Sequence, residues 1–557
     1  MLERKVVEEE NAQEYAKLGT EYAREKKWQS AVACYQKAIK IDPNFAEAYG
    51  NLAWVLTQIG EEKAAAAYWE QALKLEPNWA GAYEQAREIK PEFWRAYLEL
   101  GRAWAQTENK QKEAVEAYEQ VIKLQPPTAG DDWPKAQQEA YHQLGLILIK
   151  QGKFEAAVEY VEKALAGAAN TREIIESYSL ALGNNPKTNP KDYFQLGKIL
   201  KSKGRYDEAI DCFIAALKIK PTFYAAYGAI QYTKPVDKTK QLEKLVTCYR
   251  EILAKQPDLA IVWGNLGDAL TQQGQIEEAI KCYRLGCYQQ TIAMKPQLGE
   301  REWKEKKENP PDFVIIGCAR CGTTSLHNYL GQHPDVLLPH KKEIKFFDEQ
   351  YNLGKEWYLA HFPSITDSPG WVSGEASPSY FEYTYVAPRM LTLFPQIKLI
   401  VLLRNPVERA VSWYYHQKER GKRNQTLEES IEWEIKQLER FSEPALFNKR
   451  RRSEPNNLLG SMYIYKLDQW MRIFPREQFL ILQSEQLYSN PEQVMEQVYE
   501  FLGIAKYKGR EYPAYNGRKY SPISKELRNR LTEYLRPHNQ KLEKYLGMEF
   551  NWEEETS

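Results

Sequence analysis

The chain has 557 residues, too many for a single hydrophobic core, so two or more domains are expected. Its 76 Lys and Arg residues balance its 76 Asp and Glu residues, which argues against nucleic acid or an anionic membrane as a partner. The first residues lack the apolar core of a signal peptide, no stretch is apolar enough to span a membrane, and the seven scattered cysteines do not resemble a disulfide framework. We therefore expect a cytoplasmic protein.

The first half of the chain repeats itself. Tyr15, Tyr49 and Tyr83 are each 34 residues apart. A period of this length with two helices per unit resembles the tetratricopeptide repeat, in which stacked helix pairs share one continuous core. The resemblance covers roughly residues 10–296 and predicts an all-α solenoid over residues 1–300. Such repeats are expected to recruit a protein or peptide partner, to present an acceptor substrate, or to drive self-association.

The sequence pattern changes after the repeats. Residues 297–311 are charged and end in two prolines, which predicts a linker or a capping helix. Short aliphatic runs then alternate with longer helical segments, and those at 313–316, 399–403 and 479–482 are too short for helices. They are typical of buried parallel strands. Residues 311–557 are thus predicted to form a three-layer α/β domain of P-loop-like type with a central parallel sheet.

The first predicted strand runs into a glycine-flanked turn, GCARCGTTS (residues 317–325), and then into a helix. Backbone N–H groups in such a turn, together with the helix N-terminus, form an anion site. The two glycines have Walker A spacing, but threonine stands where that loop has lysine. The missing lysine counts against ATP chemistry and fits a loop that holds a 5′-phosphosulfate without magnesium. An ordinary glycine turn and a redox pair of Cys318 and Cys321 are the alternatives.

With this loop as the first motif, residues 311–548 resemble the sulfotransferases of the heparan sulfate N- and 3-O-sulfotransferase type. The resemblance implies transfer of a sulfuryl group from 3′-phosphoadenosine-5′-phosphosulfate (PAPS). Arg320 stands where the family usually has a lysine, and it is expected to stabilise charge on the leaving phosphate. The resemblance assigns the 5′-phosphosulfate to Arg320, Cys321, Gly322, Thr323, Thr324 and Ser325.

A second motif, HPDVLLPHKKEIKFFD, carries the general base in this family, and the corresponding residue is Glu343. The chemistry needs such a group because the acceptor must lose a proton as it attacks sulfur. Lys345 stands where some relatives have a histidine, and it is a candidate for contact with the acceptor. In a third motif, GEASPSYF, Glu375 matches, but Ala376 replaces a lysine of heparan-type relatives. This departure leaves the acceptor open.

The fourth motif, LIVLLRNPVERAVSWYYHQ, places Arg404 at the end of a predicted strand and Ser412 on the helix that follows. The resemblance assigns both residues to the 3′-phosphate of the nucleotide, for which arginine supplies bidentate contacts. His416 is four residues past Ser412, on the same helix face, where N-sulfotransferase relatives have an active-site histidine. A last match, NGRKYSPIS, resembles a loop that closes over the nucleotide, which adds the cofactor-binding candidates Gly517, Arg518, Lys519 and Tyr520.

The predicted reaction is an in-line displacement at sulfur by a hydroxyl or amine of a glycan, a metabolite or a protein. Glu343 would act as the base, and Arg320 with His416 would stabilise charge. No metal is expected, because no cluster has plausible ligand spacing. A P-loop kinase is disfavoured by the missing lysine and by the pair Arg404 and Ser412. A repeat scaffold with an inactive transferase domain is disfavoured by the presence of Glu343 and Arg404.

Overall fold

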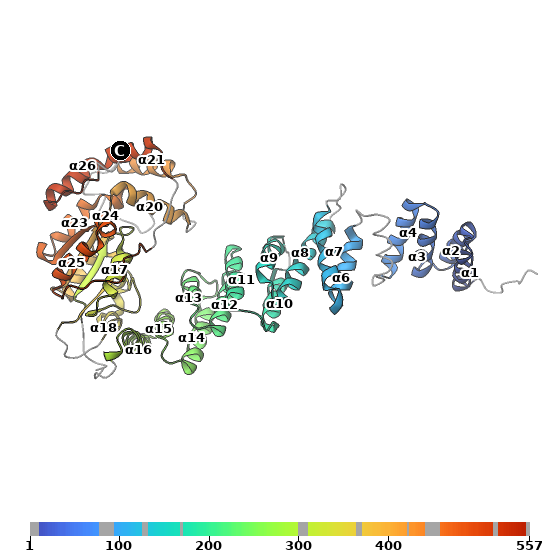
Figure 1. Cartoon of the computed structure of the whole chain (residues 1–557), viewed down its shortest axis with the longest axis horizontal. Helices are drawn as coiled ribbons and strands as arrows, with labels where there is room; N and C mark the ends of the chain where they lie inside the picture. Colours follow the sequence, from blue (N-terminus) through green and yellow to red (C-terminus); the bar gives the residue numbers. More distant parts are fainter. Residues whose placement is uncertain are drawn as a thin grey trace, which may run out of the picture. The chain divides into compact units, whose positions relative to one another are not determined.

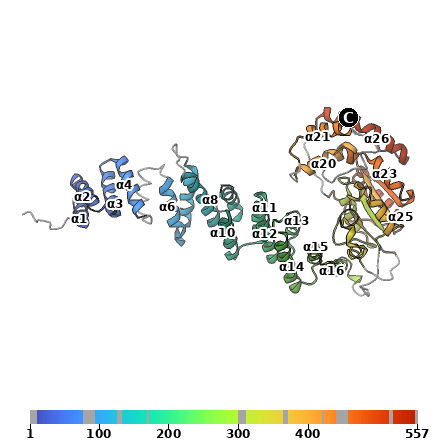
Figure 2. The same cartoon turned by 180° about the vertical axis from the view of Figure 1, so that it is seen from behind.

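The computed structural model describes residues 11–76, 94–124, 132–167, 171–298, 310–363, 370–419, 423–439, 457–515 and 522–552. The chain divides into two compact units, residues 1–241 and residues 242–557. Figures 1 and 2 show helices in the first unit and helices around a sheet in the second.

The described part of the first unit is helical and built from pairs of neighbouring helices. The pairs α1 with α2, α3 with α4, α6 with α7, α8 with α9 and α11 with α12 pack most closely. The helices are α1 (Ala12–Arg24), α2 (Trp28–Ile41), α3 (Ala46–Gln58), α4 (Glu62–Leu75), α6 (Trp94–Ala105), α7 (Gln111–Lys123), α8 (Asp132–Lys150), α9 (Phe154–Gly167), α10 (Thr171–Asn184), α11 (Pro190–Ser202), α12 (Tyr206–Ile219) and α13 (Tyr224–Gln231).

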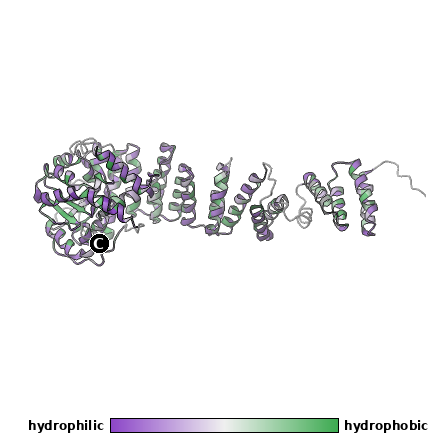
Figure 3. Ribbon diagram, turned by 90° about the horizontal axis from the view of Figure 1, so that it is seen from above, coloured by the Kyte–Doolittle hydropathy of each residue, from purple (hydrophilic) through white to green (hydrophobic). Residues whose placement is uncertain are grey.

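The close approach within a helix pair depends on a small residue facing an aromatic ring. A Cβ added at Gly19 would lie 2.8 Å from the ring of Tyr35, and one at Gly101 would lie 2.8 Å from the ring of Tyr118. Both tyrosines are buried. Hydrophilic and hydrophobic residues alternate along these helices (Figure 3), as expected when each helix buries one face against its neighbours. The predicted solenoid of helix pairs is confirmed.

The second unit begins with helices of the same kind and continues into a parallel sheet. Most of α14 (Lys238–Lys255), all of α15 (Ala260–Gln272) and α16 (Ile276–Met294) belong to it. Within the described residues, five strands pair in parallel in the order β2-β3-β1-β4-β5. They are β1 (Phe313–Gly317), β2 (Val336–Leu337), β3 (Val372–Ala376), β4 (Lys398–Leu403) and β5 (Phe479–Gln483).

The central strands are buried along their length, as a sheet covered by helices on both faces requires. The described α-helices of this domain are α17 (Thr323–Gly331), α18 (Lys355–Leu359), α19 (Val386–Leu393), α20 (Pro406–Glu419), α21 (Leu427–Leu438), α23 (Tyr463–Met471), α24 (Ser484–Ser489), α25 (Pro491–Leu502) and α26 (Lys525–Leu546). The three predicted strands correspond to β1, β4 and β5, and the α/β fold with a parallel sheet is confirmed.

The predicted domain boundary between residues 300 and 311 stays a prediction, because residues 299–309 lie outside the described residues. Within the described ranges, no helix combines the length and the apolar character that crossing a bilayer needs. The seven cysteines are free thiols.

Candidate active site

Strand β1 leads into the loop that the sequence identified as an anion site. Gly322 is the N-cap of α17, has a φ of 89°, and provides no side-chain cap for the first turn. A Cβ at this position would come within 3.1 Å of the hydroxyl of Tyr488. Glycine is therefore favoured here by both conformation and space. The N-terminus of α17 follows the carboxyl end of a central strand, where an anion is stabilised by the helix dipole.

Three of the nominated residues meet beside this loop. Arg320 donates from Nε to Oγ of Ser412 at 3.0 Å, although the two are 92 residues apart. Arg404 follows β4 and donates from Nη1 to the backbone oxygen of Arg320 at 3.5 Å. Glu408 lies 3.7 Å from Nη2 of Arg404. Two guanidinium groups and one buried hydroxyl thus gather next to a helix N-terminus, a combination suited to phosphate groups.

A buried arginine that was not predicted from the sequence supports the loop. Arg409 is 1% exposed and donates from Nε to the backbone oxygen of Ala319 at 3.3 Å. It also donates from Nη1 to the backbone oxygen of Asn457 at 3.1 Å and lies 3.7 Å from Glu382. The available signal was its position on the helix, three residues before Ser412 and therefore on nearly the same face.

The two cysteines of the loop lie in the core beneath it. Cys318 and Cys321 are both fully buried free thiols. Burial raises the pKa of Cys318 well above its ordinary value. Burial acts in the same direction on Cys321, but hydrogen bonds and the charge of Arg409 hold the pKa of Cys321 below its ordinary value. Ser484 donates to the backbone oxygen of Cys321 at 3.0 Å, which ties the loop to the end of β5.

The nominated base lies in a loop that we name the base segment, residues 340–346. Glu343 and Lys345 both adopt positive φ angles, 65° and 58°, which non-glycine residues rarely do. The side chain of Glu343 is 41% exposed, and its Oε1 accepts from Nζ of Lys342 at 2.9 Å. Nζ of Lys345 lies 3.9 Å from its Oε2. The carboxylate is therefore accessible to an acceptor and flanked by two ammonium groups.

A buried glutamate at the end of β3 holds this segment from the core. Glu375 is fully buried and accepts hydrogen bonds from Ser377 at 2.6 Å, Tyr380 at 2.9 Å and Tyr358 at 3.0 Å. Burial raises its pKa to about 7, although these hydrogen bonds act in the opposite direction.

Two of the three hydroxyls that donate to Glu375, those of Ser377 and Tyr380, also accept hydrogen bonds from the base segment. The N–H of Lys345 donates to Oγ of Ser377 at 3.2 Å, and the N–H of Phe346 donates to the hydroxyl of Tyr380 at 2.8 Å. Each hydroxyl can do both, because its single proton goes to the carboxylate and its oxygen remains an acceptor. Glu375 therefore positions the backbone beside Glu343. The sequence showed Glu375 only as a motif match, because burial was not visible in it.

The remaining nominated residues have fewer described contacts with the anion site. His416 is on α20, one turn past Ser412, with its ring 5.7 Å from that of Trp413. Thr323 and Ser325 are buried in the first turn of α17, and Thr324 is partly exposed between them. The four candidates Gly517, Arg518, Lys519 and Tyr520 lie outside the described residues.

The described residues that precede those four candidates in the chain contact the helix of the anion site. Tyr515, just before it, donates its N–H to Oγ of Ser325 at 3.2 Å. The hydroxyl of Tyr329 on α17 binds the backbone oxygens of Tyr512 and Pro513 at 3.0 and 2.9 Å.

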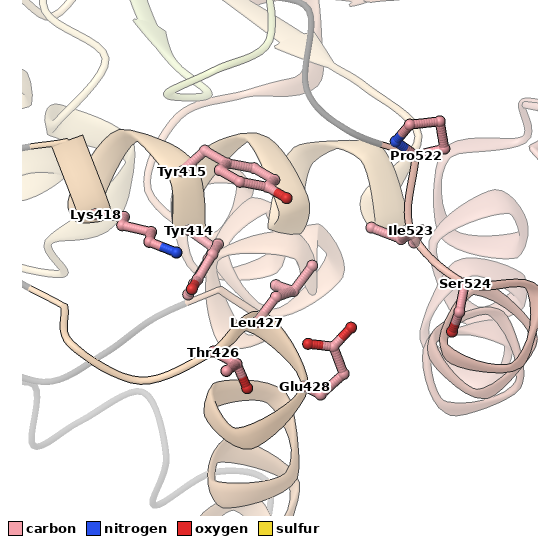
Figure 4. A pocket seen from close by; sticks show the side chains of 9 residues that line it. All are labelled: Tyr414, Tyr415, Lys418, Thr426, Leu427, Glu428, Pro522, Ile523 and Ser524. Carbon is pink, nitrogen blue, oxygen red and sulfur yellow. The ribbon is translucent and has the colours of Figure 1, made fainter.

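A pocket elsewhere on the domain is not the nominated site. It lies between the later turns of α20, the start of α21 and the segment that leads into α26 (Figure 4). None of the nominated residues lines it. Its lining residues are Tyr414, Tyr415, Lys418, Thr426, Leu427, Glu428, Pro522, Ile523 and Ser524. Over the described ranges, no group of three or more His, Cys, Asp or Glu side chains could hold a metal ion.

Comparison with known families identifies the two kinds of domain. The family model of the sulfotransferase domain matches residues 310–544. Models of the tetratricopeptide repeat match residues 19–60, 46–78, 80–129, 138–166, 190–223 and 260–289. The chain thus carries a sulfotransferase domain behind a series of tetratricopeptide repeats, which confirms the resemblance seen in the sequence.

Among curated relatives, the membrane-associated sulfotransferase kil1 of Dictyostelium discoideum is 29% identical over 46% of this chain and 72% of that protein. The bifunctional heparan sulfate N-deacetylase/N-sulfotransferase 4 of Mus musculus is 30% identical over 44% of this chain. The match spans 31% of the mouse protein's length. A solved sulfotransferase from Alicyclobacillus acidocaldarius is 29% identical, with a TM-score of 0.36 and coverage of 44% of this chain and 99% of that one.

Proposed function

We propose that the α/β domain transfers the sulfuryl group of PAPS to a hydroxyl or amine of an acceptor, which is a glycan, a metabolite or a protein. The observation that carries this proposal is the meeting of Arg320, Ser412 and Arg404 at the N-terminus of α17. The similarity to relatives that are named as sulfotransferases supports it.

The residues present fit a nucleotide with phosphate groups at both its 5′ and 3′ positions. The first turn of α17 has no side-chain cap, so its N–H groups can bind the 5′-phosphosulfate together with the hydroxyls of Thr323 and Thr324. Arg404 and Ser412 would hold the 3′-phosphate. When bound, PAPS supplies an activated sulfuryl group on a phosphate leaving group.

Glu343 accepts the proton of the acceptor hydroxyl or amine while that oxygen or nitrogen forms its bond to sulfur. The sulfur–oxygen bond to the leaving phosphate breaks in the same displacement. Arg320 stabilises the negative charge that this phosphate gains, with the loop N–H groups and His416 as further stabilising groups. Most of the rate enhancement comes from positioning and from charges already in place, as in phosphoryl transfer.

An acceptor screen with donor labelled in the sulfuryl group tests the proposal. The panel contains glycans with free hydroxyls or amines, small phenols and amines, and tyrosine peptides. We expect label to reach at least one class, and Glu343→Gln to lower turnover about 100-fold or more without changing bisphosphate affinity. The control is Glu496→Gln, which removes an exposed carboxylate paired with Lys506. Full turnover in Glu343→Gln would remove this residue from the base role.

For the repeats, we propose that they recruit a protein or peptide partner or present the acceptor. We also propose a cytoplasmic location, as the sequence predicts, although the relative from Dictyostelium discoideum is named as membrane-associated.

A further inference from the structure

The last repeat packs directly on the base segment. We propose that helices α15 and α16 position the catalytic base and that Asp268 is the main positioning residue. This inference rests on the proposed role of Glu343 as the base. It assigns the final repeat to the working part of the enzyme as well as to the solenoid.

The first contact is an ion pair next to the base. Oδ2 of Asp268, on α15, lies 2.5 Å from Nζ of Lys341, two residues before Glu343. The other oxygen of Asp268 accepts from the hydroxyl of Tyr283 on α16 at 2.9 Å. Burial alone would raise the pKa of Asp268, but the charge of Lys341 and the two hydrogen bonds hold that pKa below its ordinary value. Asp268 therefore stays ionised, and it connects α15 both to Tyr283 on α16 and to Lys341 of the base segment.

The second contact is a histidine inserted into the repeat. The ring of His340 fills the space beside Gly264, so that any side chain at Gly264 would collide with it. The same ring stacks on Tyr283, with centroids 5.9 Å apart, and on His361, with centroids 5.7 Å apart. The aromatic ring of the repeat thus packs against histidines of the catalytic domain.

Further contacts make the repeat a firm support. Nε1 of Trp357 donates to Oγ1 of Thr271 at 3.0 Å. Helix α16 has 19 residues, whereas the second helices α2 and α12 of earlier repeats have 14. After this longer helix, the ammonium of Lys295 binds the backbone oxygens of His333, Pro334 and Val336 at the start of β2.

The base segment needs such support because of its backbone. Non-glycine residues keep positive φ angles only where the surroundings hold them, and Glu343 and Lys345 both have such angles. The Glu375 network restrains the segment after Glu343. Before Glu343, the segment is restrained by the ion pair of Lys341 with Asp268 and by the packing of the His340 ring against Gly264. Loss of either restraint should loosen the position of the carboxylate while leaving the phosphate loop in place.

Hydrogen exchange of the full chain, read by mass spectrometry, tests the inference. In Asp268→Asn we expect peptides covering residues 340–347 to exchange about tenfold faster. Peptides of residues 313–330 and the affinity for adenosine 3′,5′-bisphosphate should stay unchanged. Lys341→Gln leaves the repeat intact and should give the same result if Asp268→Asn folds poorly. The charge-exchanged pair Asp268→Lys with Lys341→Asp should restore slow exchange. With an acceptor found by the screen, the single variants should lower turnover about tenfold.

The matched control is Glu278→Gln, which removes another ion pair of α16, the one with Arg250 on α14. The inference is overturned if residues 340–347 exchange at the wild-type rate in Asp268→Asn and Lys341→Gln, or if the control accelerates them equally. A wild-type protein that binds no bisphosphate would refute the proposed function. The exchange result would still decide whether the repeat holds the segment.

Discussion

Replacing Glu375 with glutamine should change how the stability of the α/β domain depends on pH. Burial raises the pKa of this carboxyl from its ordinary value of 4.5 to about 7. Since the folded protein binds the proton more tightly than the unfolded chain, this group stabilises the fold most below pH 4.5. Its contribution is lost as the pH rises to about 7.

The size of the loss follows from the pKa difference. Each pKa unit corresponds to about 1.4 kcal/mol, so ionisation of Glu375 in the fold costs about 3 kcal/mol. Glutamine has no proton to lose, and in Glu375→Gln this part of the pH dependence should vanish. Wild type should therefore lose about 3 kcal/mol relative to the variant between pH 4 and pH 8.

Urea titrations at several pH values measure this difference, with exchange of peptides from β1 and β4 reporting on the α/β domain alone. Glu496→Gln, at an exposed glutamate, should follow the wild-type curve. Parallel pH curves for wild type and Glu375→Gln would refute the reasoning. They would mean that the three hydroxyl donors keep the carboxylate ionised in the folded protein at no cost.

Three further predictions concern the phosphate loop. Arg320→Ala should lower turnover about 100-fold and Arg320→Lys less than tenfold, because the lysine ammonium replaces the positive charge of the guanidinium but not its paired N–H donors. Steady-state rates with an acceptor found by the screen measure both effects. Gly322→Ala should destabilise the protein by about 1–2 kcal/mol and weaken bisphosphate binding, because Gly322 has a φ of 89° and the hydroxyl of Tyr488 lies against an added methyl group. Thermal unfolding measures the change in stability, and calorimetry measures the change in affinity. Arg409→Met should cost about 2–4 kcal/mol in urea unfolding, because the loop oxygen of Ala319 loses a buried donor.

Much of this architecture could be predicted because its signals are periodic or local. The 34-residue spacing of Tyr15 and Tyr49 reflects one helix pair per unit, and the glycine-flanked turn is contiguous in the chain. Strand β4 was visible because it is buried on both faces and therefore uniformly aliphatic. The short β2 has only two residues, too few to carry a pattern.

The supports of the site could not be predicted, because they depend on contacts between distant segments. In the sequence, Arg409 cannot be distinguished from other charged residues of its helix; only the fold shows that it donates to the phosphate loop at Ala319. Asp268 lies in a repeat whose sequence resembles the others, and only the fold places it against Lys341. Glu375 was noticed through its motif, but its role depends on the hydroxyls of Ser377 and Tyr380, which accept hydrogen bonds from the base segment.

The most direct measurement of the central claim is a calorimetric titration with adenosine 3′,5′-bisphosphate, beside ADP. We predict micromolar binding of the bisphosphate, at least about 100-fold weaker binding of ADP, and a similar loss of affinity in Arg404→Ala. Arg472→Ala, at an exposed arginine paired with Asp468, should bind like wild type. Equal affinity for the two nucleotides, or unchanged affinity in Arg404→Ala, would contradict the account.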